Sequence, residues 1–227
     1  MCAPAAVAPE SNAPMDEERL NELPARELIE RLATGDPIPG GGSAAALAGA
    51  TAAALMRMVV ALTSGRPAAS GKEDELTEIA LAAATCQSEL LNLVELDASA
   101  YDAVVRARRL PRGTDLERHN RAVQIATATR EATHAPLQTA RLAEQVLSLG
   151  ERLAPIGSRH AISDVGVGAV LAAAAVRGAV LNVQINLPSL DVDDPLRAEA
   201  AGDVARLTDG LDNRERALRE RVEGLIG

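Results

Sequence analysis

The sequence contains almost no aromatic side chains: among 227 residues there is no tryptophan, no phenylalanine and one tyrosine, Tyr101. Aromatic and β-branched residues favour strands, whereas alanine, which makes up about a fifth of this chain, favours helices. Proteins that bind single-stranded nucleic acid stack several bases on aromatic rings, and one tyrosine is too few for such a platform. The scarcity of aromatic residues therefore argues against a β-rich fold and against a surface for single strands.

Lysine and cysteine are scarce as well. Lys72 is the only lysine, and 32 acidic residues against 23 basic ones give a formal net charge of −9. A negative protein is repelled by nucleic acid and by anionic membrane surfaces, so we expect neither as a partner. Cys2 and Cys86 are too few for a disulfide framework and indicate a reducing compartment. Because the N-terminus lacks the basic start and apolar run of a signal peptide, we expect a cytoplasmic protein.

Two apolar segments, residues 43–62 and 161–187, are long enough to cross a membrane. The first carries the charged Arg57, and the second carries charged and amide side chains, which are costly in hydrocarbon. Alanine is also much less apolar than leucine. We therefore predict two buried central helices, whose small residues allow a close approach of backbones, and no membrane insertion.

Apolar periodicity and loop residues predict about six helices joined by short loops. This pattern is typical of an all-α protein, a single helical bundle with long central helices. We expect residues 1–16, rich in proline, alanine and small polar residues, to be a disordered tail, and residues 17–227 to form the domain. The predicted helices span residues 17–34, 44–63, 72–110, 115–149, 164–186 and 194–225.

Ser43, Thr114 and Ser163 precede three of these helices and are predicted as their N-caps. Glu117 stands three residues after Thr114, which is the spacing of a capping box. Pro136 lies inside the fourth predicted segment and should kink or split it.

A glycine run, Gly40, Gly41 and Gly42, leads into the second predicted helix at Ser43. Backbone N–H groups at a helix start are free to bind a carboxylate or phosphate, and the helix dipole adds partial positive charge there. The alternative is a flexible hinge with an ordinary cap. The run is not a P-loop, because no Gly-Lys-Ser/Thr follows it.

Asp97 is the most unusual charge on the third predicted helix. At about 100° per residue, it shares a mostly apolar face with Val94, Tyr101, Val105 and Arg108. An isolated charge in an apolar site is strongly disfavoured, so a buried aspartate must be paired or functional. Burial and neighbouring charges tune the pKa of such a group for acid–base chemistry. The alternative interpretation is an ion pair with Arg108.

Three further polar groups lie at or within apolar segments. Asp164 follows Ser163 in the first turn of a predicted helix, where it can simply complement the dipole. Asn182 and Asn186 lie one turn apart, and as buried amides they must bond another helix or the polar edge of a heterocycle. The three histidines lack the spacing of a metal site, so we expect no metal.

Five ordered stretches resemble the cyclodeaminase/cyclohydrolase family. This family includes the C-terminal domain of formiminotransferase-cyclodeaminase and stand-alone methenyltetrahydrofolate cyclohydrolases. The similarity extends from about Leu23 to Leu190. The matching stretches are PGGGSAAA at residues 39–46, residues 58–63, DASAY at 97–101, RLPR at 109–112, and residues 163–187.

The resemblance implies an all-helical homodimer that acts on a tetrahydrofolate derivative and needs no cofactor beyond that substrate. It places the acid–base group at Asp97. The residues that it suggests for substrate binding are Gly40, Gly41, Gly42, Ser43, Arg66, Tyr101, Arg109, Arg112, Asp164, Asn182 and Asn186, the arginines being suited to the glutamate tail. The family often has lysine where this chain has Arg112.

The resemblance leaves two reactions open. We favour hydrolysis of 5,10-methenyltetrahydrofolate to 10-formyltetrahydrofolate over the cyclodeaminase reaction, in which 5-formiminotetrahydrofolate loses ammonia. We expect the chain to be one such domain, without a formiminotransferase domain in front of it. A third hypothesis is a non-catalytic helical binding module, which predicts that the glycine run and Asp97 face opposite surfaces.

Overall fold

The computed structural model describes residues 19–66 and 69–226, in which helices are joined by turns and no strand occurs. The predicted all-α class is confirmed, whereas the predicted tail, residues 1–16, lies outside the described residues. The elements are η1 (Leu20–Glu22), α1 (Ala25–Leu32), α2 (Gly41–Thr63), α3 (Glu73–Arg109), α4 (Asp115–Leu153), η3 (Arg159–Ala161), α5 (Ile162–Asn186), η4 (Leu187–Ser189), α6 (Pro195–Thr208) and α7 (Leu211–Ile226).

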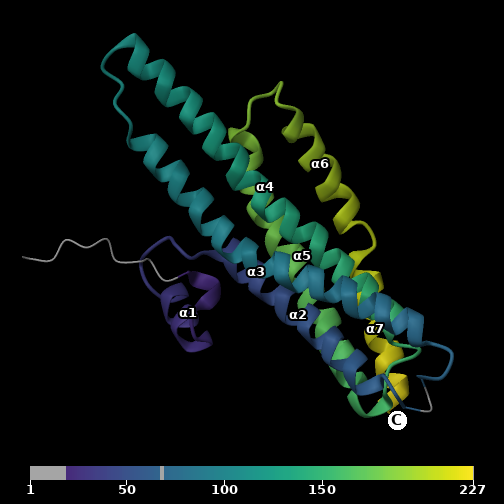
Figure 1. The fold of residues 1–227 in the computed structure, drawn as a ribbon. Helices are drawn as coiled ribbons and strands as arrows, with labels where there is room; N and C mark the ends of the chain where they lie inside the picture. Colours follow the sequence, from purple (N-terminus) through teal and green to yellow (C-terminus); the bar gives the residue numbers. More distant parts are fainter. Residues whose placement is uncertain (1–18, 67–68, 227) are drawn as a thin grey trace, which may run out of the picture.

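Helices α2, α3, α4 and α5 pack side by side as the core of the bundle, and α7 covers α5 (Figure 1). Small residues make this packing close. Met56 of α2 is fully buried, and a Cβ atom at Gly168 of α5 would lie 2.5 Å from its Cε atom. A Cβ atom at Gly150 of α4 would lie 3.0 Å from the same methyl group. The glycines of α4 and α5 thus leave the space that a long side chain of α2 fills.

Three segments, Gly41–Thr63, Glu73–Arg109 and Arg159–Ser189, are long and apolar enough to span a membrane by length and composition. The most apolar window is 50% buried within the bundle in the first segment and 56% buried in the third. The apolar residues of these two segments therefore pack against other helices of the bundle. The absence of membrane insertion stays a prediction.

Helices α3 and α4 extend together beyond the other helices as an arm of two helices (Figure 1). At its tip, the Thr114 hydroxyl accepts a hydrogen bond from the Glu117 backbone N–H, and Glu117 accepts one from the Thr114 N–H, so the predicted capping box is confirmed. The arm has a small apolar core of its own, and α4 continues through Pro136, so the predicted split is wrong.

Several predicted boundaries differ from the structure. Gly40 caps α2 and a 3-10 turn precedes α5, so Ser43 and Ser163 lie within first turns and are not N-caps. The predicted first helix is a 3-10 turn followed by α1, which begins after Pro24. The predicted last helix is divided into α6 and α7 at Gly210, whose φ of 66° favours glycine.

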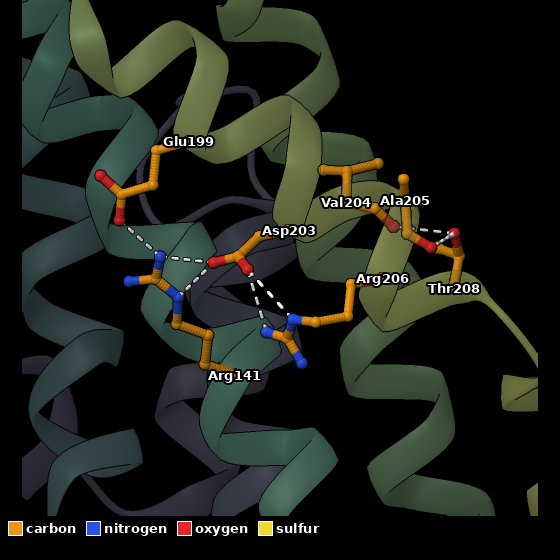
Figure 2. Close-up of polar contacts among 7 residues, drawn as sticks. All are labelled: Arg141, Glu199, Asp203, Val204, Ala205, Arg206 and Thr208. Carbon is orange, nitrogen blue, oxygen red and sulfur yellow. Dashed lines mark hydrogen bonds and ion pairs between the residues drawn. The ribbon is translucent and has the colours of Figure 1, made fainter.

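Charged side chains attach α6 to α4 (Figure 2). Arg141 of α4 donates hydrogen bonds to Glu199 and Asp203 of α6, each at 2.6 Å, and Arg206 donates to Asp203 at 3.0 Å. Burial raises the pKa of the Asp203 carboxyl, but the guanidinium groups of Arg141 and Arg206 together lower it by more, so the pKa lies below its usual value. Beneath these pairs, Leu196 and other apolar residues of α6 pack against the end of α5 and hold it in place.

Candidate active site

A cavity of about 400 Å³ lies where α2 begins, α5 ends and the arm leaves the bundle. Three kinds of group meet in it: backbone of the glycine run, side chains of α3, and amides of α5. The lining residues are Pro37, Ile38, Gly40, Gly41, Gly42, Asp97, Ala98, Tyr101, Val104, Arg108, Ala132, Asn182, Ile185, Asn186 and Ser189.

Asp97 lies in the wall that α3 contributes. Its Oδ2 atom is 3.0 Å from the hydroxyl of Ser43, which is 1% exposed and lies 2.9 Å from the Val94 carbonyl oxygen. Burial raises the pKa of the Asp97 carboxyl, and hydrogen bonds from the Ser43 hydroxyl and backbone N–H oppose part of that rise. A carboxyl with a raised pKa is suited to taking up and returning a proton near neutral pH.

Gly42 of α2 packs against this carboxyl. A Cβ atom at residue 42 would lie 2.0 Å from the Asp97 Oδ1 atom and 2.5 Å from its Cγ atom, which no real contact allows. Glycine at this position lets the first turn of α2 touch the carboxyl. The partial positive charge at the start of α2 is therefore next to Asp97, where it favours the ionised form.

The two asparagines of α5 lie on the opposite wall. The Asn182 amide donates to the Gly178 carbonyl at 2.9 Å, and the Asn186 amide donates to the Ala132 carbonyl of α4 at 2.7 Å. Asn186 thus bonds another helix, one of the two roles expected for it. A Cβ atom at Gly41 would lie 3.6 Å from the Asn182 amide nitrogen, so this amide stands beside the glycine run.

Tyr101 and Arg108 continue the wall of α3 toward the arm. No ion pair within 4.0 Å joins Asp97 to Arg108 in the described part of the chain, so the alternative interpretation of Asp97 as the partner of Arg108 is wrong. About 16 Å of helix separates the two residues. The Arg108 side chain lines the cavity without an ion pair to Asp97.

Five residues suggested for substrate binding lie outside this lining, and four of them have no contact with Asp97. Arg66 donates to the Ser158 hydroxyl at 3.1 Å, beyond the opposite end of α2. Asp164 is in the first turn of α5, about 27 Å along the helix from Asn182. Arg109 ends α3 and Arg112 lies in the loop at the tip of the arm.

Ser43 also lies outside the lining, behind the glycine run, where it contacts Asp97. The lining includes residues that the sequence analysis did not identify, among them Pro37, Ile38 and Ile185. They are loop and apolar residues without a chemical signature. Within residues 19–66 and 69–226, no group of three or more histidine, cysteine, aspartate or glutamate residues is arranged to hold a metal ion.

Comparison with known proteins decides the family. The formiminotransferase-cyclodeaminase family model matches residues 24–206. The chain belongs to this family. It is 38% identical over 164 residues to the methenyltetrahydrofolate cyclohydrolase of Methylorubrum extorquens, covering 72% of this chain and 79% of that protein.

Formimidoyltransferase-cyclodeaminases are similar over a smaller part of their own length. The mouse formimidoyltransferase-cyclodeaminase is 32% identical over 177 residues, which cover 78% of this chain and 33% of the mouse protein. The fold of this chain matches the crystal structure of formiminotetrahydrofolate cyclodeaminase from Thermotoga maritima with a TM-score of 0.80 at 24% identity. The match covers 92% of this chain and all of that chain, and it shows that the two share a fold.

The contact at Gly42 makes a direct prediction about stability. Replacing Gly42 with alanine should destabilise the protein by about 1–3 kcal/mol, because the new methyl group forces the Asp97 carboxyl to move. Gly202 of α6 is the matched control, since a Cβ atom there meets nothing within 4 Å. Alanine at Gly202 should stabilise by about 0.5–1 kcal/mol. Urea unfolding measures both; a Gly42→Ala protein as stable as the wild type would contradict the described contact.

Proposed function

We propose that this enzyme adds water to 5,10-methenyltetrahydrofolate and forms 10-formyltetrahydrofolate, with Asp97 as the general acid–base group. The observation that carries the proposal is the cavity in which Asp97 and the glycine-rich start of α2 meet. The similarity to the Methylorubrum cyclohydrolase, which extends over most of that protein, supports this reaction.

The bridging carbon of the substrate carries amidinium-like positive charge, and an ionised Asp97 beside it stabilises that charge. Water attacks this carbon through its oxygen, and one of its protons passes to Asp97. The product of this step is a neutral carbinol adduct. A positioned general base of this kind contributes about 10²–10⁴ in rate.

The adduct then opens. Asp97 returns its proton to N5 as the bond from N5 to the bridging carbon breaks, and the hydroxyl proton of the adduct leaves to water. The carbon becomes the formyl group on N10, and Asp97 is ionised again. The overall reaction consumes one water molecule and releases one proton.

The shape of the cavity gives the substrate a direction. With the reacting carbon at Asp97, the wall formed by Tyr101, Val104 and Arg108 leads toward the arm. The benzoyl group lies along this wall and the glutamate carboxylate meets the Arg108 guanidinium, a charge-assisted pairing. Arg109 and Arg112 follow on the arm, and they extend the positive charge toward further glutamates.

The same site supports a second reaction, the cyclodeaminase reaction, because formimidoyltransferase-cyclodeaminases also match this chain. In that reaction N10 attacks the formimino carbon of 5-formiminotetrahydrofolate, and Asp97 carries the N10 proton to the departing ammonia. Both reactions need one carboxyl that accepts and returns a proton. The non-catalytic hypothesis loses its support, since the glycine run and Asp97 line one cavity and do not face opposite surfaces.

The proposed unit is a homodimer. Helix α5 presents a stripe of large apolar side chains to solvent, Val167, Val170, Leu181 and Ile185, each at least 46% exposed. Met58 and Leu62 extend this apolar surface on α2, which packs against α5. A second copy placed on this stripe removes it from water, and the hydrophobic effect then stabilises the pair.

Sedimentation equilibrium tests the dimer. The wild type should sediment at twice the mass of one chain, and Leu181→Glu, which puts a charge into the stripe and lies outside the cavity lining, should sediment as single chains. Leu116→Glu, at the tip of the arm where the side chain is 69% exposed, is the same substitution away from the stripe and controls for the added acidic side chain. A wild type with the mass of one chain would contradict the proposal.

Replacing Asp97 with asparagine tests the acid–base role. Asparagine keeps the shape and accepts the Ser43 hydrogen bond but cannot take a proton, so turnover should fall about 10²–10⁴-fold while the fold remains. The assay is the loss of methenyl absorbance in the near ultraviolet. Asp102→Asn on the same helix, outside the cavity lining, should turn over at the wild-type rate. Unchanged activity of Asp97→Asn would overturn the assignment.

Replacing Arg108 with alanine tests the orientation of the substrate. Loss of a charged hydrogen bond of about 1.5–3 kcal/mol should raise KM by about one to two orders of magnitude and leave kcat within a few-fold. Arg106 is the matched control, because it pairs with Asp102 at 2.8 Å and its side chain is 70% exposed. Equal effects of Arg108→Ala and Arg106→Ala would contradict the proposed direction.

A further inference from the structure

The Ser43 hydroxyl lies between two oxygen atoms. Its Oγ atom is 2.9 Å from the Val94 carbonyl oxygen and 3.0 Å from the Asp97 Oδ2 atom, both on α3. The side chain is 1% exposed. A hydroxyl carries one proton and can donate it to only one of these oxygens at a time.

The protonation state of Asp97 decides between them. An ionised carboxylate only accepts hydrogen bonds, so the hydroxyl then donates to Oδ2. A protonated carboxyl can donate its own O–H to the Ser43 Oγ atom, and the Ser43 hydroxyl then turns and donates to the Val94 carbonyl. Both arrangements satisfy every group with the heavy atoms in the same places.

We infer that Ser43 is a positioning residue whose hydroxyl turns from Asp97 to the Val94 carbonyl when Asp97 takes up a proton. The carboxyl therefore keeps a hydrogen bond throughout its acid–base cycle and has no reason to move. Ser43 retains its own proton: the proton taken from the substrate water stays on Asp97 until it is returned. This inference rests on the proposed role of Asp97 as the acid–base group.

Other groups around the carboxyl do not duplicate this role. Helix α2 contributes backbone N–H groups at its start, among them that of Ser43, which can donate to the carboxyl but cannot accept a hydrogen bond from it. Helix α4 contributes the apolar Ala132. On α3, Tyr101 and Arg108 face the cavity, and no ion pair joins Arg108 to Asp97 in the described part of the chain. On α5, the Asn182 and Asn186 amides donate to backbone carbonyls.

The sign of the effect follows from the hydrogen bond. In the ionised state the Ser43 hydroxyl donates to a carboxylate, and this charge-assisted hydrogen bond is stronger than the neutral one that Ser43 accepts from the protonated carboxyl. The Ser43 hydroxyl therefore lowers the pKa of the Asp97 carboxyl. Removing the hydroxyl should therefore raise that pKa. Because the proposed base is active when ionised, the acidic limb of the pH profile of kcat/KM should move to higher pH. On the acidic side of the wild-type midpoint, activity should fall by about tenfold or more.

The experiment is a carbon-13 NMR titration of the Asp97 carboxyl in substrate-free protein, with the resonance assigned by its loss in Asp97→Asn. Ser43→Ala removes the hydroxyl, Ser43→Cys fills the space with a weak donor, and Ser43→Thr keeps the hydroxyl. Thr139→Val is the control, since it removes a buried hydroxyl that donates to the Ala135 carbonyl in α4. The pH profile of kcat/KM is measured on the same proteins.

Ser43→Ala and Ser43→Cys should titrate at higher pH than the wild type, Ser43→Thr close to the wild type, and Thr139→Val at the wild-type pH. If the folded alanine and cysteine variants titrate as the wild type does, Ser43 is not a positioning residue. The titration needs no substrate, so it tests the role of Ser43 separately from the proposed folate reaction. A wild type that turns over neither folate would remove the proposed function, while the carboxyl titration would still decide the role of Ser43.

Discussion

The first turn of α2 lies against the Asp97 carboxyl so closely that residue 42 has no room for a side chain. This contact connects the packing of the bundle with the chemistry of the cavity. It requires glycine at one position of α2, and it depends on α2 and α3 lying side by side. Small residues further along, such as Gly49 beside Leu90, maintain the same close approach in the core.

The contact also sets the electrostatics of the site. Burial raises the pKa of the Asp97 carboxyl, because a charge in an apolar site is disfavoured. Hydrogen bonds from Ser43 and the positive start of α2 favour the ionised form. The two influences oppose each other, and burial is the larger, so the pKa of the carboxyl lies above its usual value. A general acid–base group needs this balance, and its parts come from two helices that are distant in sequence.

The long helices, and the position of Asp97 on a mostly apolar face of one of them, could be predicted from the sequence, because helical periodicity shows which charge lies on an apolar face. The partner of Asp97 could not be predicted in this way. Spacing within one helix pointed to Arg108, whereas the hydrogen-bond partner is Ser43, which lies 54 residues earlier in the chain. Such contacts depend on how the helices pack.

Other differences have local causes. The sequence predicts Ser43 as the N-cap of α2, but the helix begins earlier and Gly40 is its N-cap. The break between α6 and α7 depends on a positive φ at Gly210, which residues other than glycine rarely adopt. Asp164 belongs to a stretch that matches the family, yet it lies at the other end of α5 from the asparagines that line the cavity. Matching stretches show that the chain belongs to the family, but they do not show which of their residues lie together in the cavity.

The central claim is that 5,10-methenyltetrahydrofolate binds with its bridging carbon at Asp97. A crystal structure of the Asp97→Asn protein with this folate bound tests it most directly. The bridging carbon should lie within about 3–3.5 Å of the residue 97 side chain or of a water molecule held by it. The glutamate carboxylate should point toward Arg108. A folate bound elsewhere, for example near Arg66 and Asp164 at the opposite end of the bundle, would contradict this binding mode.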